Sequence, residues 1–170
     1  MSSGFGLDSG DTRSPRQNQL RLRPMTSADL DVLLPFEDVM FGTEAWSRQS
    51  YEDELADTTL RDYLVAESAD GTLLGSSGLM TIASTSQILT VGVLPPARRR
   101  GIGRVLVQAL VEIARRRGAV EVLLEVRIDN EAAKKLYESE GFAVLGLRRG
   151  YYDNGRVDAV TMRLGLPDAR

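Results

Sequence analysis

A basic segment with two glycines, residues 98–104, carries the clearest chemical signal in the chain. It reads Arg-Arg-Arg-Gly-Ile-Gly-Arg and lies between an aliphatic stretch at 88–93 and an amphipathic stretch that begins at Ile102. Prolines 95 and 96 end the first stretch as a strand, because proline donates no ladder hydrogen bond. A helix that starts near Gly101 leaves backbone N–H groups unpaired, and its positive dipole end favours phosphate oxygens. The segment predicts a cradle for a polyphosphorylated ligand, with added charge from Arg98, Arg99, Arg100 and Arg104.

The spacing of residues in this segment limits which phosphate ligands it could bind. A nucleoside triphosphate loop needs Lys followed by Ser or Thr after its last glycine, whereas Arg104-Val105 stands here. A dinucleotide fingerprint needs a third small residue where Leu106 stands, although Glu121 is placed to imitate its ribose-binding acid. A kinase-like or GTPase-like loop is therefore disfavoured, and dinucleotide binding stays open as a weaker alternative.

The residue types that are missing restrict the chemistry. The sequence holds no cysteine and no histidine, which excludes a thiolate nucleophile, a Ser-His-Asp triad, a disulfide and a zinc site of the usual kind. We expect no metal. Catalysis must then use Asp, Glu, Tyr, Lys, backbone dipoles or water.

Length and composition predict one domain. A chain of 170 residues with 42% hydrophobic content can bury one core. Residues 1–19 are polar and are expected to form a disordered tail, 20–165 the domain and 166–170 a C-terminal tail. The first nineteen residues lack the apolar run of a signal peptide, and no run of eighteen apolar residues occurs. We therefore expect a cytoplasmic protein without a membrane partner.

Periodicity and turn signals predict how these residues are positioned. The chain alternates strands and helices, and the turns fall at Asp70-Gly71 and at Asp153-Asn154-Gly155. Strands are expected at 20–23, 63–67, 73–80, 87–93, 119–127, 142–149 and 156–164. Helices are expected over 30–39, 47–55, from the basic loop to 117, and over 130–140.

Several motifs together resemble the GCN5-related N-acetyltransferases. The basic loop matches their Q/R-x-x-G-x-G/A motif, and 129–133 and 136–142 (Asp-Asn-Glu-Ala-Ala and Leu-Tyr-Glu-Ser-Glu-Gly-Phe) match the segment that closes the same fold. The run Arg148-Arg149-Gly150-Tyr151-Tyr152 with Asp158-Ala159 is similar to the subgroup that acetylates protein N-termini, above all the ribosomal-protein-alanine N-acetyltransferases.

The resemblance implies a fold and a co-substrate. The fold is a single mixed α/β domain whose mostly antiparallel sheet splays around an acetyl-CoA site, with helices on both faces. The loop, including Gly101, Ile102 and Gly103, would bind the diphosphate of acetyl-CoA. The backbone of Val91, Gly92 and Val93 would pair with the pantetheine arm, and Asn130 would cap a helix and touch the cofactor.

Glu125 is the predicted general base. In the strand 119–127, Val120, Val122, Leu124 and Val126 share one face, so Glu125 projects to the other, near the carboxyl end of the strand. A protein α-amino group has a pKa of about 7.7–8.0 and attacks only when deprotonated, which a carboxylate can bring about directly or through water. The alternative is that Glu125 only forms an ion pair with Arg127 or Arg148.

Tyr137 is the predicted proton donor to the departing thiolate. The resemblance places the tyrosine of Leu-Tyr-x-x-x-Gly-Phe beside the sulfur of CoA, and the alternative role is aromatic packing. Since the chain lacks cysteine, we expect direct transfer in a ternary complex.

Aromatic and acidic residues indicate which class of molecule accepts the acetyl group. The resemblance places loop aromatics at the walls of a peptide slot: Phe41, Trp46, Tyr151 and Tyr152. Residues 37–57 carry seven acidic side chains, among them Glu44, against Arg48, whereas 98–117 carries seven arginines against Glu112. An acidic rim would attract a cationic amine or a basic peptide.

The leading hypothesis is an N-acetyltransferase whose acceptor is a protein or peptide N-terminus, possibly that of a ribosomal protein. The alternatives are acetylation of a polyamine or aminoglycoside, and a non-catalytic acyl-CoA-binding module. We expect no direct nucleic-acid partner and a monomer or weak homodimer.

Overall fold

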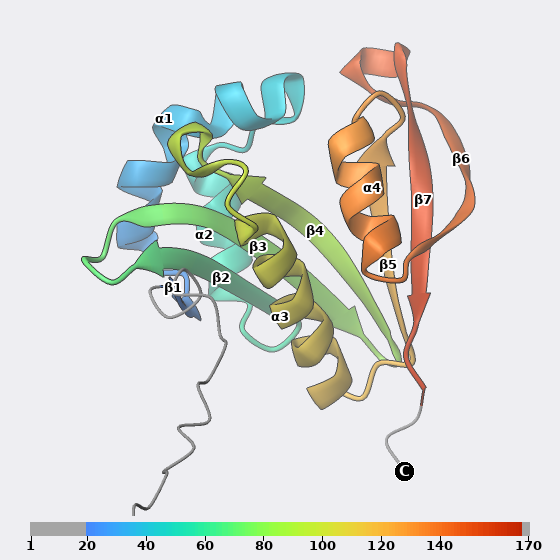
Figure 1. Cartoon of the computed structure of the whole chain (residues 1–170), viewed down its shortest axis with the longest axis horizontal. Coiled ribbons are helices and arrows are strands. Elements are labelled where there is room, and N and C mark those ends of the chain that lie inside the picture. The colour runs from blue at the N-terminus through green and yellow to red at the C-terminus, as the bar shows by residue number, and fades with distance from the viewer. Residues whose placement is uncertain (1–19, 168–170) are drawn as a thin grey trace, which may run out of the picture.

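Seven strands form one mixed sheet in the computed structural model, which describes residues 20–167 (Figure 1). The order across the sheet is β1-β2-β3-β4-β5-β7-β6, and β4 and β5 are its parallel pair while the other neighbours are antiparallel. The strands are β1 (Leu20–Pro24), β2 (Arg61–Ser68), β3 (Leu73–Ile82), β4 (Thr85–Val93), β5 (Glu121–Arg127), β6 (Ala143–Tyr152) and β7 (Val157–Gly165).

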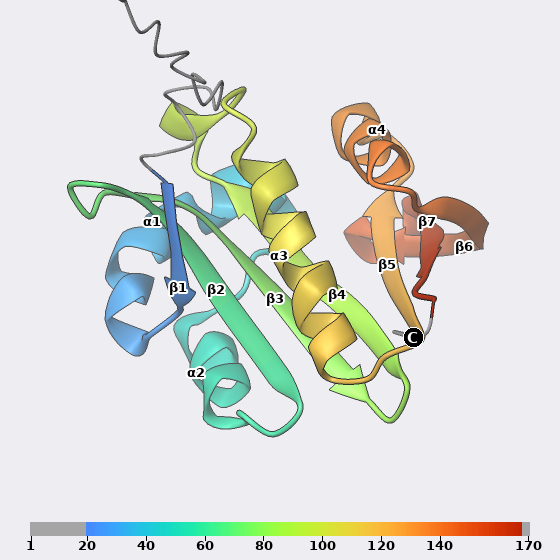
Figure 2. The ribbon, with the colours of Figure 1, turned by 60° about the horizontal axis from the view of Figure 1, so that its bottom comes forward.

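Helices cover both faces of the sheet, as Figures 1 and 2 show. On one face, α1 (Leu30–Phe41) and α2 (Arg48–Ala56) pack on β2 around Leu33, Tyr51 and Val65. On the other face, α3 (Ile102–Arg116) and α4 (Glu131–Ser139) share a core with alternate residues of β5, listed as Val107, Leu110, Val122, Leu124 and Tyr137. The predicted mixed α/β fold is confirmed.

Local sequence accounts for the helix that leaves the basic loop. α3 buries Ile102, Leu106 and Leu110 completely or nearly so, and Ile113 partly. This stripe at three- and four-residue spacing lies against the sheet and leaves the arginines at both ends exposed. The hydrophobic period therefore fixes which way the start of α3 faces.

The sheet opens between its two parallel strands. β4 and β5 pair only from Thr85 with Glu121 to Ile88 with Leu124. The β3–β4 register then shifts, because Gly78 pairs with Thr90 and Leu79 with Ile88, so Leu89 is an extra residue that bends β4. Residues 89–93 and 125–127 thus have no partner in each other's strand, and the strands diverge in Figure 1. The backbone edge of β4 that faces β5 is left available to a ligand.

Two boundaries differ from the prediction. Val120 is 46% exposed and precedes β5, so it does not share the buried face of Val122, Leu124 and Val126. Leu166, which the prediction assigned to the tail, is buried, and its N–H donates to the carbonyl of Val120. The expected tail at 1–19 lies outside the described residues.

Candidate active site

The start of α3 presents unpaired backbone donors. The N–H groups from Arg99 to Arg104 make no hydrogen bond within residues 20–167. Gly101, the N-cap, has φ 77°, a left-handed conformation that glycine adopts without strain. Arg98, Arg99 and Arg100 are exposed, and no other element covers them. These donors fit a diphosphate, which supports the predicted role of the loop.

Arg104 and Gly103 have roles that the sequence did not reveal. Arg104 forms an ion pair with Glu140 at the end of α4. A Cβ on Gly103 would lie 3.3 Å from Cδ2 of Leu136 and 3.7 Å from Cγ2 of Val93. This glycine therefore allows α3 to lie close to α4 and β4, in addition to its predicted place in the diphosphate loop.

Side chains flank the exposed edge of β4 on both faces of the sheet. Val91 and Val93 pack toward the α3 side of the sheet. Gly92 faces α1, where an added Cβ would lie 2.8 Å from Cζ of Phe41 and 3.1 Å from Sδ of Met40. The structure thus places Phe41 against the strand that is expected to bind pantetheine.

Glu125 lies on the side of β5 that α4 does not cover. Its Oε1 accepts a hydrogen bond of 3.1 Å from Nη1 of Arg148, and its Oε2 accepts one of 2.6 Å from Oγ1 of Thr161. The side chain is only 12% exposed. The predicted direction is confirmed, and so is the ion pair with Arg148 that was the alternative to a catalytic role. Arg127 instead pairs with Asp129 and Asp153.

Tyr137 is buried in α4 and makes an edge contact with the ring of Phe142, with centroids 5.8 Å apart. Its hydroxyl makes no hydrogen bond in the described part of the chain. Burial raises the pKa of Tyr137 to about 12. The phenol therefore keeps its proton at neutral pH. Asn130 caps the same helix, since its Oδ1 accepts from the N–H of Ala133 at 3.1 Å, as predicted.

Tyr152 contacts other residues that are predicted to belong to the site. Its hydroxyl donates to the carbonyl of Glu125 at 3.2 Å, and its ring makes an edge contact with Tyr151. Burial raises the pKa of Tyr152 most, and the charges of Tyr151, Glu125, Glu44 and Tyr137 add to the effect. The structure thus brings Tyr151 and Tyr152, two predicted acceptor-site residues, next to the predicted base Glu125.

A bridge connects the two parts of the opened sheet. The N–H of Asp153, in the β6–β7 turn, donates to Oε1 of Glu44 at 3.2 Å. Thr43, beside Glu44 after α1, donates to the Asp153 carboxylate, which Arg127 also binds. The acceptor side of the opening is therefore bordered by two loops about 110 residues apart in sequence.

Trp46 lies apart from this group. Its ring packs on Tyr51 and Tyr63, with centroids 5.2 and 6.4 Å away, and it is part of the core under α1 and α2. Its backbone N–H donates to the carboxylate of Glu37, which is 3% exposed. Within residues 20–167, the contacts of Trp46 are with this core and not with the other predicted acceptor-site residues.

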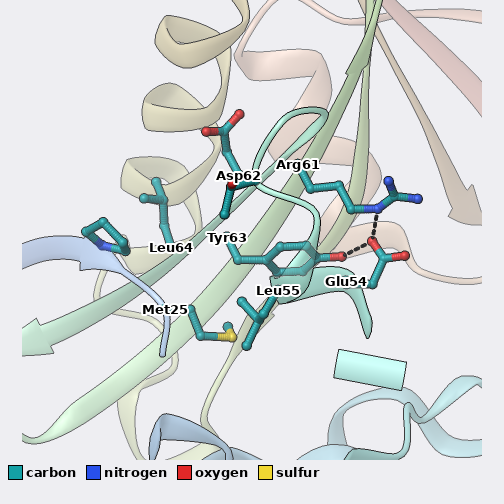
Figure 3. Close-up of a pocket in the computed structure, with 9 residues that line it drawn as sticks. Met25, Glu54, Leu55, Arg61, Asp62, Tyr63 and Leu64 are labelled. Carbon is teal, nitrogen blue, oxygen red and sulfur yellow. Dashed lines mark hydrogen bonds and ion pairs between the residues drawn. The ribbon is translucent and has the colours of Figure 1, made fainter. Parts of the chain in front are cut away.

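The predicted acidic rim is wrong as one surface. Glu37 is buried, where Tyr51 and Trp46 donate to its carboxylate. Glu54 and Asp57 bind Arg61, and Tyr63 also donates to Glu54. Figure 3 shows Glu54, Arg61 and Tyr63 in a pocket lined mainly by residues of α2 and β2. Arg61 lies just outside the window 37–57, four residues beyond Asp57, and a charge count does not show that Glu37 is buried.

Neither a membrane segment nor a metal cluster occurs in the described residues. Among residues 20–167, no helix is long and apolar enough to cross a membrane, and no group of three or more potential ligands is placed to hold a metal.

Comparison with known proteins agrees with this geometry. Residues 31–142 match the model of the acetyltransferase (GNAT) family. N-alpha-acetyltransferase RimI of Mycobacterium tuberculosis is 40% identical over 144 residues, which cover 82% of this chain and 88% of that protein. A putative [ribosomal protein bS18]-alanine N-acetyltransferase of Bacillus subtilis is 32% identical over 141 residues, with coverages of 83% and 92%.

A solved structure shares the whole fold. The crystal structure of the ribosomal-protein-S18-alanine N-acetyltransferase from Escherichia coli superposes with a TM-score of 0.78 at 26% identity, covering 89% of this chain and 96% of that one. The chain therefore belongs to the acetyltransferase (GNAT) family of acetyl-CoA-dependent N-acetyltransferases.

Proposed function

We propose that this enzyme acetylates the α-amino group of a protein N-terminus and that its acceptor is a ribosomal protein. The names of the relatives from M. tuberculosis and B. subtilis support an α-amine as acceptor, and the latter names ribosomal protein bS18. The observation that carries the proposal is the position of Glu125 at the opening between β4 and β5, where the hydroxyl of Tyr152 donates a hydrogen bond to its backbone carbonyl. An acceptor of this kind places the reaction in the cytoplasm.

The residues that would hold acetyl-CoA lie along the opening. The N–H groups at 99–104 bind the diphosphate, and Arg98, Arg99 and Arg100 supply positive charge around it. The free edge of β4 at Val91–Val93 pairs with the pantetheine arm. Acetyl-CoA supplies a thioester, from which the acetyl group passes to an amine.

Glu125 prepares the acceptor for this transfer. An α-amino group with a pKa of about 7.7–8.0 is mostly an ammonium at neutral pH, and its nitrogen has no lone pair to offer. The carboxylate of Glu125 takes this proton directly or through one water molecule. Without a cysteine in the chain, transfer proceeds directly from thioester to amine.

Tyr137 assists on the sulfur side. A thiol titrates near pH 8.5, well below the pKa of about 12 of Tyr137. The phenol is therefore a stable hydrogen-bond donor to the developing thiolate and retains its own proton until the thiolate leaves.

A thiol-release assay tests the acceptor class. The enzyme and acetyl-CoA are incubated with a peptide that begins with alanine and carries the bS18 N-terminal sequence, with the same peptide blocked at its α-amine, and with spermidine. We expect release above the hydrolysis blank for the free peptide alone. Faster release with spermidine, or equal release with the blocked peptide, would contradict the proposal.

A further inference from the structure

Both carboxylate oxygens of Glu125 are already bonded within the protein. Oγ1 of Thr161 donates to Oε2 at 2.6 Å, and Nη1 of Arg148 donates to Oε1 at 3.1 Å. Glu125 is 12% exposed, so little of the carboxylate remains for another partner. A group that must take a proton from an acceptor is thus occupied on each oxygen.

The two partners differ in how firmly they are held. Thr161 stands directly opposite Glu125 in the β5–β7 register, so its hydroxyl is fixed by the sheet. Arg148 lies on the edge strand β6, its side chain is 54% exposed, and a single N–H contacts the carboxylate. Its guanidinium also lies 4.4 Å from the ring centroid of Tyr151, which is itself 44% exposed. Arg148 can therefore leave Oε1, while Thr161 keeps Oε2 in place.

The acceptor needs the oxygen that Arg148 occupies. It arrives largely as an ammonium, a cation with N–H donors like a guanidinium. Two cations compete for one carboxylate oxygen, because each reduces the attraction that the oxygen has for the other. The two cations compete for Oε1, because the hydroxyl of Thr161, which binds Oε2, is neutral.

We propose that Arg148 is a positioning residue that occupies the ammonium subsite of Glu125 in the free enzyme and yields Oε1 to the α-ammonium of the acceptor. This inference rests on the proposed role of Glu125 as base. Thr161 keeps the carboxylate oriented during the exchange, and the aromatic face of Tyr151 keeps the displaced guanidinium nearby. Arg148 thereby sets the affinity of the enzyme for the acceptor.

Other charged and titratable groups act electrostatically on Tyr152, whose hydroxyl donates to the backbone carbonyl of Glu125. These are Tyr151 on β6, Tyr137 on α4 and Glu44 before α2, and Arg127 on β5 binds Asp153 in the β6–β7 turn. β7 contributes the neutral hydroxyl of Thr161. Arg127 is already bound to Asp129 and Asp153, so Arg148 is the cation whose removal changes the charge at Glu125 most.

The test compares Arg148→Ala and Arg148→Gln with the wild type on the alanine-initiated peptide. Removing the competitor should lower KM for the peptide by up to about fivefold at pH 8. The glutamine variant keeps an N–H donor, so agreement between the two variants excludes a packing effect.

Arg149→Ala is the matched control, because this neighbouring arginine is exposed and forms no ion pair within residues 20–167. It should leave KM unchanged. A KM that stays unchanged or rises in both Arg148 variants overturns the inference. Glu125→Gln shows whether a negative result concerns Arg148 alone or the role of Glu125 as base. If Glu125→Gln retains full activity, the proposed function of Glu125 is wrong.

Discussion

Two side chains carry the proposed chemistry, and their surroundings differ in kind. Glu125 lies among polar partners on the open side of β5, whereas Tyr137 lies in the core beside Phe142. A proton acceptor needs a polar setting that keeps it charged, and a donor benefits from burial that keeps it neutral. The strand and the helix that hold them provide these opposite settings within one site.

Glu125→Gln should lower kcat/KM for the alanine-initiated peptide by about 10²–10⁴-fold at neutral pH. The amide keeps the shape of the side chain but accepts no proton. Because the acceptor deprotonates by itself above about pH 8, the loss should shrink as pH rises. A pH series of initial rates checks this, and an equal loss at every pH would show that Glu125 is not the base.

Tyr137→Phe should reduce kcat by about tenfold to a hundredfold, the range for loss of a hydrogen bond to a charged group. The ring and its contact with Phe142 remain, so affinity for CoA and the melting temperature should stay near the wild-type values. Calorimetry and stopped-flow turnover measure the two quantities. Weak CoA binding together with normal kcat would assign Tyr137 to packing.

At the scale of elements, the opening between β4 and β5 depends on one bulge and one close contact. Leu89 bends β4 where the parallel pairing ends, and Gly92 admits the ring of Phe41 from α1. The end of α1 is thus held against the strand that is proposed to bind pantetheine. The shape of the site follows from packing between elements as well as from the loop motif.

Gly92→Ala tests this contact. An added Cβ would lie 2.8 Å from Phe41 and 3.1 Å from Met40, so one of these side chains must move. We expect a loss of about 1–3 kcal/mol in the free energy of unfolding and a higher KM for the peptide. Gly146→Ala on β6 is the control, because its Cβ meets nothing within 4 Å; equal effects in a urea titration would show that the Phe41 contact is unimportant.

Sequence patterns predicted elements better than contacts between them. The alternation in β5 gave the direction of Glu125 correctly because a strand has a period of two residues. The bonds from Arg148 and Thr161 depend on the order β5-β7-β6 and on register, which periodicity does not specify. For the same reason the charge count in 37–57 missed that Glu37 is buried and that Arg61 binds Glu54.

At the scale of the whole molecule, the N-terminal edge of the sheet is held by buried charges. Arg23 on β1 donates to Asp29 at 2.7 and 2.8 Å and to Glu67 on β2 at 2.9 Å. Both carboxylates are nearly buried, and hydrogen bonding from Arg23 is the main cause that lowers the pKa of each. The network joins β1, β2 and the turn before α1.

This network predicts how stability depends on pH. Since the folded pKa values lie below the ordinary values of 3.8 and 4.5, the stabilisation is complete above those values and is lost as pH falls below them. Arg23→Ala should lower the melting temperature at pH 7 and weaken its decline between pH 5 and pH 3. Arg21→Ala, which removes an exposed partner of Glu67, should have a smaller effect. An unchanged decline in Arg23→Ala would show that the network does not control acid stability.

The proposed function is tested most directly by locating the acetyl group on the product. The enzyme is incubated with acetyl-CoA and a peptide that carries the bS18 N-terminal sequence and an internal lysine, and the product is fragmented by tandem mass spectrometry. The proposed function predicts one acetyl group on the α-nitrogen of the N-terminal alanine, and far slower formation of this product by Glu125→Gln at neutral pH. Acetyl transfer to the lysine side chain, or an unmodified peptide from an enzyme that binds acetyl-CoA, would contradict it.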